Sequence, residues 1–285
     1  MTSDARDAPP AEDPAAEDPA AADPAAEDPA AATPASGTAP VLAGRRVVVL
    51  GGASGIGLAT VRAAATAGAA AVAVLDADGA GAARAADEVR HLGVTAYSRQ
   101  VDVTVEIEVA DAFGSIAAAW GGIDAVLHVA GIMQGQGLDV TSVPIELWHR
   151  VLSVNLTGPF LVAKHAVPHL TAGTGVLVLV GSKAGVLTGS GSVPYGASKG
   201  GLHGLALTLD RQLRPRGVRV HALCPGDIDT PLMRRSLDEA RTNGVDAGRV
   251  AGIEADLGRP EDVASALVVL AAPLSASITG TVYTG

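Results

Sequence analysis

Short apolar runs alternate with helical segments along most of the chain. The apolar runs, rich in valine and leucine, predict strands at residues 47–50, 71–75, 94–101, 125–129, 176–180, 218–223 and 278–283. Helical patterns lie between them, at residues 58–67, 80–92, 105–120, 145–171, 198–214 and 261–271. Continuous apolar strands separated by helices predict an α/β fold: a doubly wound parallel sheet, covered on both faces, in one domain over residues 41–285. Such a sheet binds its ligand beyond the carboxyl ends of its strands.

Residues 1–40 have a different composition. A proline recurs every five residues from Pro14 to Pro34. Residues 1–40 as a whole hold nine acidic residues and one basic residue, a net charge of −8. Proline disfavours helix, and alanine offers little apolar surface to offset the entropy of ordering. We therefore predict a disordered acidic Ala/Pro-rich tail. It is either a solvated spacer or a docking arm for a basic partner, and low-complexity acidic tracts favour the spacer.

Charge and cysteine usage exclude several classes of protein. The whole chain of 285 residues carries −10, so its body carries only −2 and has no basic stripe, which gives no reason to expect a nucleic-acid partner. A single cysteine, Cys224, excludes an internal disulfide and suits a reducing compartment. No apolar run reaches membrane-spanning length, and the N-terminus does not resemble a secretory signal. We expect a cytoplasmic protein that does not enter a membrane.

The first predicted strand runs directly into the sequence GGASGIGLAT. Gly51, Gly55 and Gly57 permit a tight turn and let backbone amides, with Ser54 and Ile56, approach a phosphate at the start of the next helix. Glycines can also serve only to turn a chain, but their position between a strand and a helix favours dinucleotide binding.

An acidic residue, Asp76, ends the second predicted strand, nineteen residues after Gly57. A carboxylate at this separation accepts hydrogen bonds from an adenosine ribose and repels a 2′-phosphate. The alternative is a solvated turn residue. The sequence therefore favours NAD over NADP.

Tyrosine and lysine stand four residues apart in the stretch YGASK, so Tyr195 and Lys199 lie on one helical face. A free phenol has a pKa near ~10, and a nearby ammonium together with an oxidised nicotinamide would lower it. Ser182 ends the fifth predicted strand, thirteen residues earlier, where it could hold a substrate oxygen. Each residue alone is unremarkable, but the three together behind a glycine turn indicate proton-transfer chemistry.

These motifs resemble the short-chain dehydrogenase/reductase family, of the compact type with a Rossmann fold, over residues 41–285. The glycine turn is similar to the family's T-G-x-x-x-G-x-G, with leucine for threonine, and YGASK to its Tyr-x-x-x-Lys. The segment SVNLTGPF resembles the family's asparagine segment. The resemblance makes Asn155, Ser182, Tyr195 and Lys199 the catalytic residues. Further cofactor contacts that it implies are Asp102, Val103, Ala130, Gly131, Pro225, Gly226, Ile228 and Thr230, alongside Tyr195 and Lys199 themselves.

The chain departs from the family pattern after the fourth strand, where N-N-A-G is replaced by His128-Val129-Ala130-Gly131. We expect this change to affect stability or loop shape more than chemistry. His128 is expected to be a satisfied structural residue, because it has no clustered partner for metal binding. No metal site is predicted.

The resemblance implies hydride transfer between NAD and a substrate carbon, interconverting a secondary alcohol and a ketone. Tyr195 exchanges the hydroxyl proton, Ser182 holds the oxygen, and Asn155 orients a relay water. We expect a mostly apolar substrate site, for a hydrophobic or cyclic alcohol, beneath a mobile lid at residues 232–257. Its expected wall residues are Met133, Gln134, Val186 and Val193. The nearby Arg234, Arg235 and Arg249 could bind an anionic substrate or face water, and the sequence favours exposure to water.

Two alternatives remain. One is a carbonyl reductase like the 3-oxoacyl-carrier-protein reductases, which usually take NADP and carry a basic residue where this chain has Ser54. The other is a non-catalytic NAD-sensing protein, which would not need the four catalytic residues. The resemblance also implies a homotetramer, or a homodimer, formed through the helices that hold Asn155 and Lys199.

Overall fold

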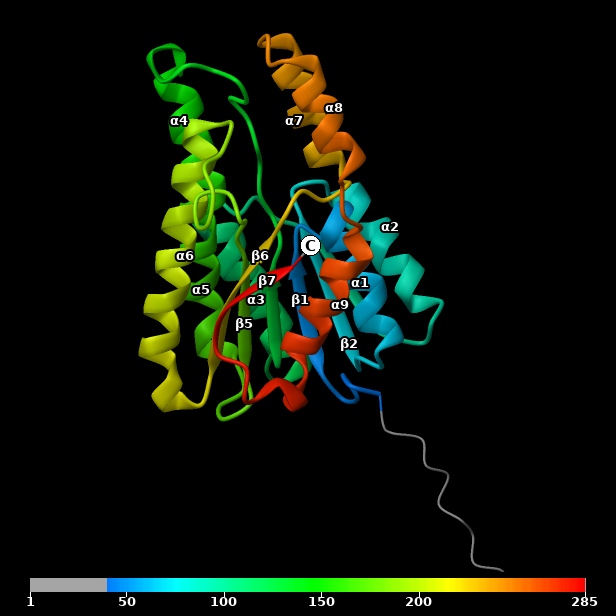
Figure 1. Cartoon of the computed structure of the whole chain (residues 1–285). Helices are drawn as coiled ribbons and strands as arrows, with labels where there is room; N and C mark the ends of the chain where they lie inside the picture. Colours follow the sequence, from blue (N-terminus) through cyan, green and yellow to red (C-terminus); the bar gives the residue numbers. More distant parts are fainter. Residues whose placement is uncertain (1–39, 285) are drawn as a thin grey trace, which may run out of the picture. The chain divides into compact units, whose positions relative to one another are not determined.

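The computed structural model describes residues 40–284, and these form a single parallel sheet of seven strands flanked by helices (Figure 1). The strand order is β3-β2-β1-β4-β5-β6-β7. The strands are β1 Arg46–Leu50, β2 Ala71–Asp76, β3 Thr95–Gln100, β4 Ala125–His128, β5 Val176–Val180, β6 Arg219–Pro225 and β7 Gly280–Thr284. The predicted doubly wound fold is confirmed. The predicted tail, apart from Pro40, lies outside the described residues.

The longer helices are α1 Gly55–Thr66, α2 Gly79–Arg90, α3 Glu106–Trp120, α4 Ile145–Leu152, α5 Gly158–Ala166, α6 Val193–Leu213, α7 Pro231–Thr242, α8 Ala247–Ala255 and α9 Pro260–Ala271. Short 3-10 turns occupy Val140–Ser142, Val167–His169, Arg214–Arg216 and Pro273–Ser275, and a π-helical turn occupies Ser153–Thr157. Within residues 40–284, no helix has both the length and the apolar character that crossing a bilayer requires. The cytoplasmic location stays a prediction.

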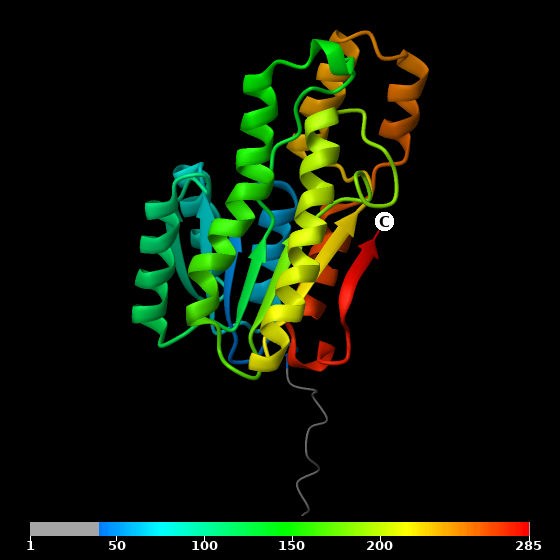
Figure 2. The same cartoon turned by 90° about the vertical axis from the view of Figure 1, so that its left-hand side faces the viewer.

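Alternation along the strands builds two apolar cores, one on each face of the sheet. In β1, for example, Val47 and Val49 face the core shared with α1, α2 and α9, whereas Val48 and Leu50 face the core shared with α3, α5 and α6. Figure 1 shows the two helical layers on either side of the sheet, and Figure 2 views the sheet face-on, with the green and yellow helices of the second core nearest the viewer. Because both faces are covered, the five inner strands are almost entirely buried, whereas the edge strands β3 and β7 are partly exposed.

The helix predicted over residues 145–171 is interrupted. It divides into α4, the π-helical turn Ser153–Thr157, α5 and a 3-10 turn. Pro159 explains the break, because it has no N–H to donate to the carbonyl of Asn155 four residues earlier. The π-helical turn that results carries the buried Asn155, and such turns are frequent at functional sites.

Helix α6 begins at Val193, five residues before the predicted start. The Ser192 hydroxyl caps it by accepting a hydrogen bond from the backbone N–H of Tyr195 at 3.3 Å. Pro194 fits the first turn, where its missing N–H costs nothing. The earlier start places Tyr195 in the first turn of the helix and Lys199 one turn further along.

Residues 232–257, expected to be a mobile lid, form most of α7 and the whole of α8. The two helices share a small apolar core of Leu237, Ala240 and Val250. An ion pair at 2.5 Å joins Arg241 of α7 to Glu254 of α8. The segment is therefore a packed helical hairpin, and its motion stays a prediction.

A buried carboxylate ties β1 to the start of β4, and its removal should weaken the fold. Asp124 accepts hydrogen bonds from the Arg46 side chain and backbone and from Thr171. Burial alone would raise the pKa of Asp124, but these bonds bring it down to about 2. Because this value is below the ordinary 3.8, the ionised carboxylate stabilises the fold above about pH 4, and this is lost as the pH falls towards 2.

We expect Asp124→Asn to lower the free energy of unfolding by about 2 kcal/mol at pH 7, with a smaller loss at pH 3. Urea unfolding at the two pH values measures this. Asp87→Asn, which breaks an exposed pair with Arg90, serves as the control and should cost less than ~0.5 kcal/mol. Equal losses for the two variants at pH 7 would contradict the role of Asp124.

Candidate active site

The strand order changes direction between β1 and β4, whose carboxyl ends lie side by side. A groove of about 360 Å³ opens at this point. Among its lining residues are the predicted cofactor contacts Gly51, Ser54, Gly55, Ile56, Gly57, Asp76, Asp102, Val103, Ala130, Gly131 and Thr230. Residues far apart in the sequence are thus brought together where a dinucleotide is expected.

The glycine turn has the shape that close backbone approach requires. Gly51 has φ of +80°, and a Cβ there would lie 2.6 Å from the backbone nitrogen of Ala130, in the loop after β4. A Cβ at Gly57 would overlap the carbonyl oxygen of Gly51. The turn therefore leaves open the space in front of α1, where backbone amides and the helix N-terminus can receive a diphosphate. The geometry of this turn therefore fits a dinucleotide cofactor.

Asp76 is held by the backbone around it. One carboxylate oxygen accepts a hydrogen bond from Ala53 N–H in the glycine turn, and the other accepts one from Asp78 N–H, both at 2.9 Å. Each carboxylate oxygen can accept a second bond, so a ribose diol could still donate to Asp76. The carboxylate thus both orders the turn and faces the groove.

The expected adenine contact also has a local role. The Asp102 carboxylate accepts hydrogen bonds from the backbone and hydroxyl of Thr104, at 2.8 and 2.7 Å. This turn places Asp102 and Val103 on the wall of the groove.

A second cavity, of about 70 Å³, brings together the predicted proton-transfer residues. Ser182 from the end of β5 and Tyr195 and Lys199 from α6 line it together with the predicted loop residues Pro225, Gly226, Ile228 and Thr230. This cavity shares Ile56, Gly131, Thr230 and Leu232 with the cofactor groove. The reacting end of a cofactor in the groove would therefore reach the tyrosine.

Two buried polar side chains, Asn155 and Lys199, form hydrogen bonds with the backbone around this small cavity. The Asn155 amide bonds both backbone groups of Ile132 at 2.8 Å and the Ser198 hydroxyl at 3.1 Å. The Lys199 ammonium donates to the carbonyl oxygen of Val180 at 2.9 Å and lies 5.6 Å from the centre of the Tyr195 ring. Asn155 therefore positions the loop after β4, and its role in holding a relay water stays a prediction.

In the protein without cofactor, the phenol of Tyr195 has a raised pKa. Burial is the largest cause, the charge of Asp227 adds to it, and a hydrogen bond with Ser182 opposes it, so that the pKa of Tyr195 is about 12. Burial also lowers the pKa of Lys199, to about 8. Burial is therefore the main influence on the phenol in the protein without cofactor. The lowering of this pKa by Lys199 together with an oxidised nicotinamide stays a prediction.

The contribution of Asp227 gives a prediction for the pH profile. Its negative charge disfavours the phenolate, so Asp227→Asn should lower the pKa of Tyr195 and move the acidic limb of kcat/KM for alcohol oxidation to lower pH. Asp229→Asn is the matched control, since Asp229 pairs with Arg234 and is not among the groups that raise the pKa of the phenol. A shift to higher pH, or equal shifts in the two variants, would show that Asp227 does not act on the phenol.

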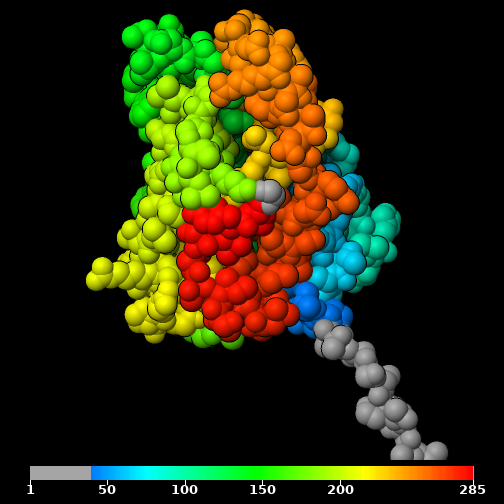
Figure 3. All heavy atoms as spheres, in the orientation of Figure 1, coloured from blue at the N-terminus to red at the C-terminus, as the bar shows by residue number. Residues whose placement is uncertain are grey.

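A third cavity, of about 860 Å³, lies over Tyr195 and Ser182. Its walls come from the loop after β5, the loop after β6, and the hairpin of α7 and α8, and Figure 3 shows the hollow between the yellow-green loop and the orange hairpin. This is the candidate substrate site.

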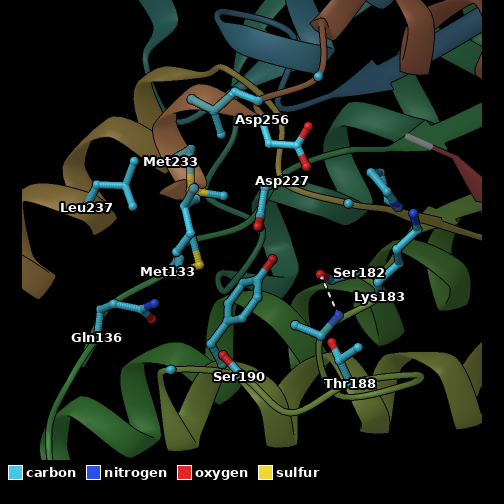
Figure 4. A pocket seen from close by; sticks show the side chains of 18 of the residues that line it. Met133, Gln136, Ser182, Lys183, Thr188, Ser190, Asp227, Met233, Leu237 and Asp256 are labelled. Atoms are coloured by element: carbon cyan, nitrogen blue, oxygen red, sulfur yellow. Dashed lines mark hydrogen bonds between the residues drawn. The ribbon is translucent and has the colours of Figure 1, made fainter. Parts of the chain in front are cut away.

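The lining of the substrate cavity is more charged than expected. Figure 4 shows Met133, Met233 and Leu237 on one side, and Asp227, Asp256 and Lys183 nearer the other. Arg249 also lines it. The sequence-based expectation of a mostly apolar site did not include Lys183, Asp227 or Asp256, which lie in loops without any periodic pattern to mark them, and it favoured solvation for Arg249.

Of the expected substrate contacts, only Met133 lines this cavity. Gln134, Val186 and Val193 are not among its lining residues. Val186 packs against the core shared with α3, α5 and α6, and Val193 is exposed at the start of α6. Contact of these residues with a substrate stays a prediction.

Hydrogen bonds connect helix α7 to the loop after β4, which holds Gly135 and Gln136. The Glu239 carboxylate of α7 accepts from the backbone N–H groups of Gly135 and Gln136, at 2.9 and 3.3 Å. Asn243 donates to the carbonyl oxygen of Gln136 at 2.8 Å. Helix α7 is therefore attached to the loop that contributes Gln136 to the wall of the substrate cavity.

His128 is buried at the end of β4 but is not satisfied as expected. Within residues 40–284 neither ring nitrogen has a hydrogen-bond partner. Burial, with a smaller contribution from the charge of Lys199, lowers the pKa of His128 to about 3, so the imidazole is neutral at pH 7. Among the described residues, no three histidine, cysteine or acidic side chains converge as a metal ion would require.

Comparison with known proteins identifies the family. Residues 51–284 match a family model described as enoyl-(acyl carrier protein) reductase. A D-beta-hydroxybutyrate dehydrogenase of Rhizobium meliloti (strain 1021) is 33% identical over 247 residues, which cover 83% of this chain and 95% of the relative. A cis-4-hydroxycyclohexanecarboxylate dehydrogenase of Sinomonas cyclohexanicum is 35% identical over 245 residues, with coverage of 84% and 94%.

A solved structure adds to these similarities. A short-chain dehydrogenase of Burkholderia cenocepacia J2315 in complex with NADP superposes with a TM-score of 0.74 at 28% identity, covering 85% of this chain and 96% of that one. The seven-stranded parallel fold agrees with this match. The chain therefore belongs to the short-chain dehydrogenase/reductase family and is an NAD(P)-dependent oxidoreductase that acts on hydroxyl and carbonyl groups.

Proposed function

We propose that this protein is an NAD-dependent dehydrogenase that interconverts a secondary alcohol and a ketone, with Tyr195 as the acid and base. One observation carries the proposal: Tyr195, Ser182 and Lys199 line one small cavity that shares walls with both the cofactor groove and the substrate cavity. A non-catalytic NAD sensor would have no use for this arrangement.

The cofactor would be held by the glycine turn and Asp76 at one end and by the loop from Pro225 to Thr230 at the other. When bound, it accepts or supplies the hydride. In oxidation, the Ser182 hydroxyl holds the substrate oxygen while Tyr195 takes the hydroxyl proton. In reduction, the high pKa of the buried phenol keeps the proton available for donation to the substrate oxygen.

Lys199 would assist this proton transfer through its charge, and Asn155 through the loop that it holds. Lys199 lies beneath the phenol ring and would contribute positive charge when protonated, and its pKa of about 8 makes that charge depend on pH near neutrality. Asn155 fixes the loop after β4 through Ile132. Together they keep the small cavity in the shape the reaction needs.

The preference for NAD rests on Asp76. Its carboxylate lies in the groove, where it favours a ribose diol and opposes a 2′-phosphate. We expect NADH to bind more tightly than NADPH in a fluorescence titration of the purified protein. Tighter binding of NADPH would overturn the assignment to Asp76 and favour the 3-oxoacyl-carrier-protein reductase alternative.

The experiment that tests the proposed activity is a panel of secondary alcohols and ketones, followed by nicotinamide absorbance. The panel should pair hydroxy acids with uncharged alcohols of the same skeleton, because two relatives are named for hydroxy acids and Lys183 and Arg249 line the cavity. It should also include a 3-oxoacyl thioester with NADPH. Cofactor binding without turnover of any member would favour the non-catalytic alternative.

The proposed assembly is a homotetramer or a homodimer formed through α5 and α6. Phe160 on α5 and Leu207 on α6 are large apolar side chains with about half of their surface exposed, at 49% and 47%. Light scattering coupled to gel filtration measures the state directly. A monomer at micromolar concentration would contradict this assembly.

A further inference from the structure

The cofactor groove has an unusual charge balance for a site that must hold a diphosphate. Its lining includes two acids, Asp76 and Asp102, and only one base in the described part of the chain, Arg235. The glycine turn itself contributes no lysine or arginine. A helix N-terminus offers only about half a unit of positive charge. The two negative charges of a diphosphate therefore lack a full counter-charge unless Arg235 supplies one.

Helix α7 brings Arg235 to the groove. Its N-cap, Thr230, packs against the glycine turn, since a Cβ at Gly55 would lie 3.1 Å from the Thr230 methyl group. Leu232 and Arg235 are three residues apart on one helical face, and both line the groove. The register of α7 therefore directs this arginine towards the diphosphate end of the groove, beside the glycine turn.

Arg235 is also the arginine of α7 that has no partner. Arg234 pairs with Asp229, and Arg241 pairs with Asp238 and Glu254. Within residues 40–284, Arg235 makes no hydrogen bond or ion pair, and its side chain is exposed. An arginine that is not committed to a carboxylate is free to form the paired N–H···O bonds that phosphate oxygens accept.

We infer that Arg235 binds the diphosphate of the cofactor and so makes α7 part of the cofactor site. The opposite side of the same helix carries Met233 and Leu237, which line the substrate cavity. Cofactor binding would therefore fix the helix that forms a wall of the substrate site. This inference rests on the dinucleotide cofactor of the proposed function, but not on any particular substrate.

The test measures the binding of cofactor fragments by calorimetry, without turnover. Adenosine, AMP, 2′-AMP and ADP are titrated into the wild-type protein, Arg235→Gln, Arg235→Lys and the adjacent control Arg234→Gln. We expect Arg235→Gln to weaken ADP about 10- to 100-fold, as loss of a charged hydrogen bond does, while adenosine affinity stays the same. Arg235→Lys should recover part of the loss, and Arg234→Gln should behave as the wild type.

Three results would overturn the inference. Equal losses for adenosine and ADP would indicate a distorted groove, and unchanged ADP binding would show that Arg235 faces only solvent. A loss confined to 2′-AMP would assign Arg235 to a 2′-phosphate instead. If the wild-type protein binds ADP through Arg235 yet oxidises no alcohol in the panel, the proposed activity fails while this inference stands.

Discussion

Tyr195→Phe should lower kcat by roughly 100- to 10,000-fold and leave the Kd for NADH unchanged. The substitution removes only the hydroxyl that exchanges the proton, and positioned acid–base catalysis contributes on this scale. The ring itself is buried in the first turn of α6, so phenylalanine fills the same space. Steady-state kinetics and a fluorescence titration of NADH measure the two quantities separately.

The matched control for this variant is Tyr97→Phe. Tyr97 lies on β3, within the core shared with α3, α5 and α6, and is not a lining residue of the cofactor groove or of the two catalytic cavities. Its hydroxyl should be dispensable for turnover. Activity of Tyr195→Phe within a few-fold of wild type would remove Tyr195 from the mechanism.

Gly57→Ala should abolish tight cofactor binding. The new methyl group would overlap the carbonyl oxygen of Gly51, so the turn must move away from α1. If that displacement costs about 3 kcal/mol of binding free energy, affinity for NADH falls by about 100-fold. Calorimetric or fluorescence titration of NADH gives the measurement.

Gly114→Ala is the control for this second variant. Gly114 also lies within a helix, α3, but a Cβ there meets nothing within 4 Å. The control should bind NADH normally and gain about 0.5–1 kcal/mol of stability, because alanine is the better helix former. Far-ultraviolet circular dichroism shows whether Gly57→Ala still folds. Normal NADH affinity in a folded Gly57→Ala protein would contradict the assigned role of the turn.

Regular features of the sequence predicted the fold well. Apolar runs such as residues 176–180 are buried strands because both faces of a parallel sheet are covered. The glycine turn, Asp76 and the Tyr195–Lys199 pair are short motifs with fixed spacing, and the structure places each of them at the crevice. Local spacing is enough to predict the position of a motif that lies within one turn or at the end of one strand.

Features that depend on contacts between distant segments could not be predicted. Two other differences had local causes that the apolar pattern did not reveal, since Pro159 interrupts a helix whose apolar pattern continues and Ser192 caps α6 earlier than that pattern suggested. Asp227 and Arg235 carry no signal in their own neighbourhood, and only the position of α7 and the loop before it reveals what they face. The raised pKa of Tyr195 likewise reflects burial among segments that are far apart in the sequence.

The proposed mechanism depends on the ionisation of one phenol. In the free protein the pKa of Tyr195 is raised to about 12 by burial, and a bound positive nicotinamide must bring it down for alcohol oxidation to proceed.

Nuclear magnetic resonance of isotope-labelled tyrosine, with Tyr195→Phe to assign the signal, measures this pKa with and without NAD⁺. We expect the signal of Tyr195 to titrate at a clearly lower pH in the NAD⁺ complex than in the free protein. The same pKa in both states would contradict the mechanism.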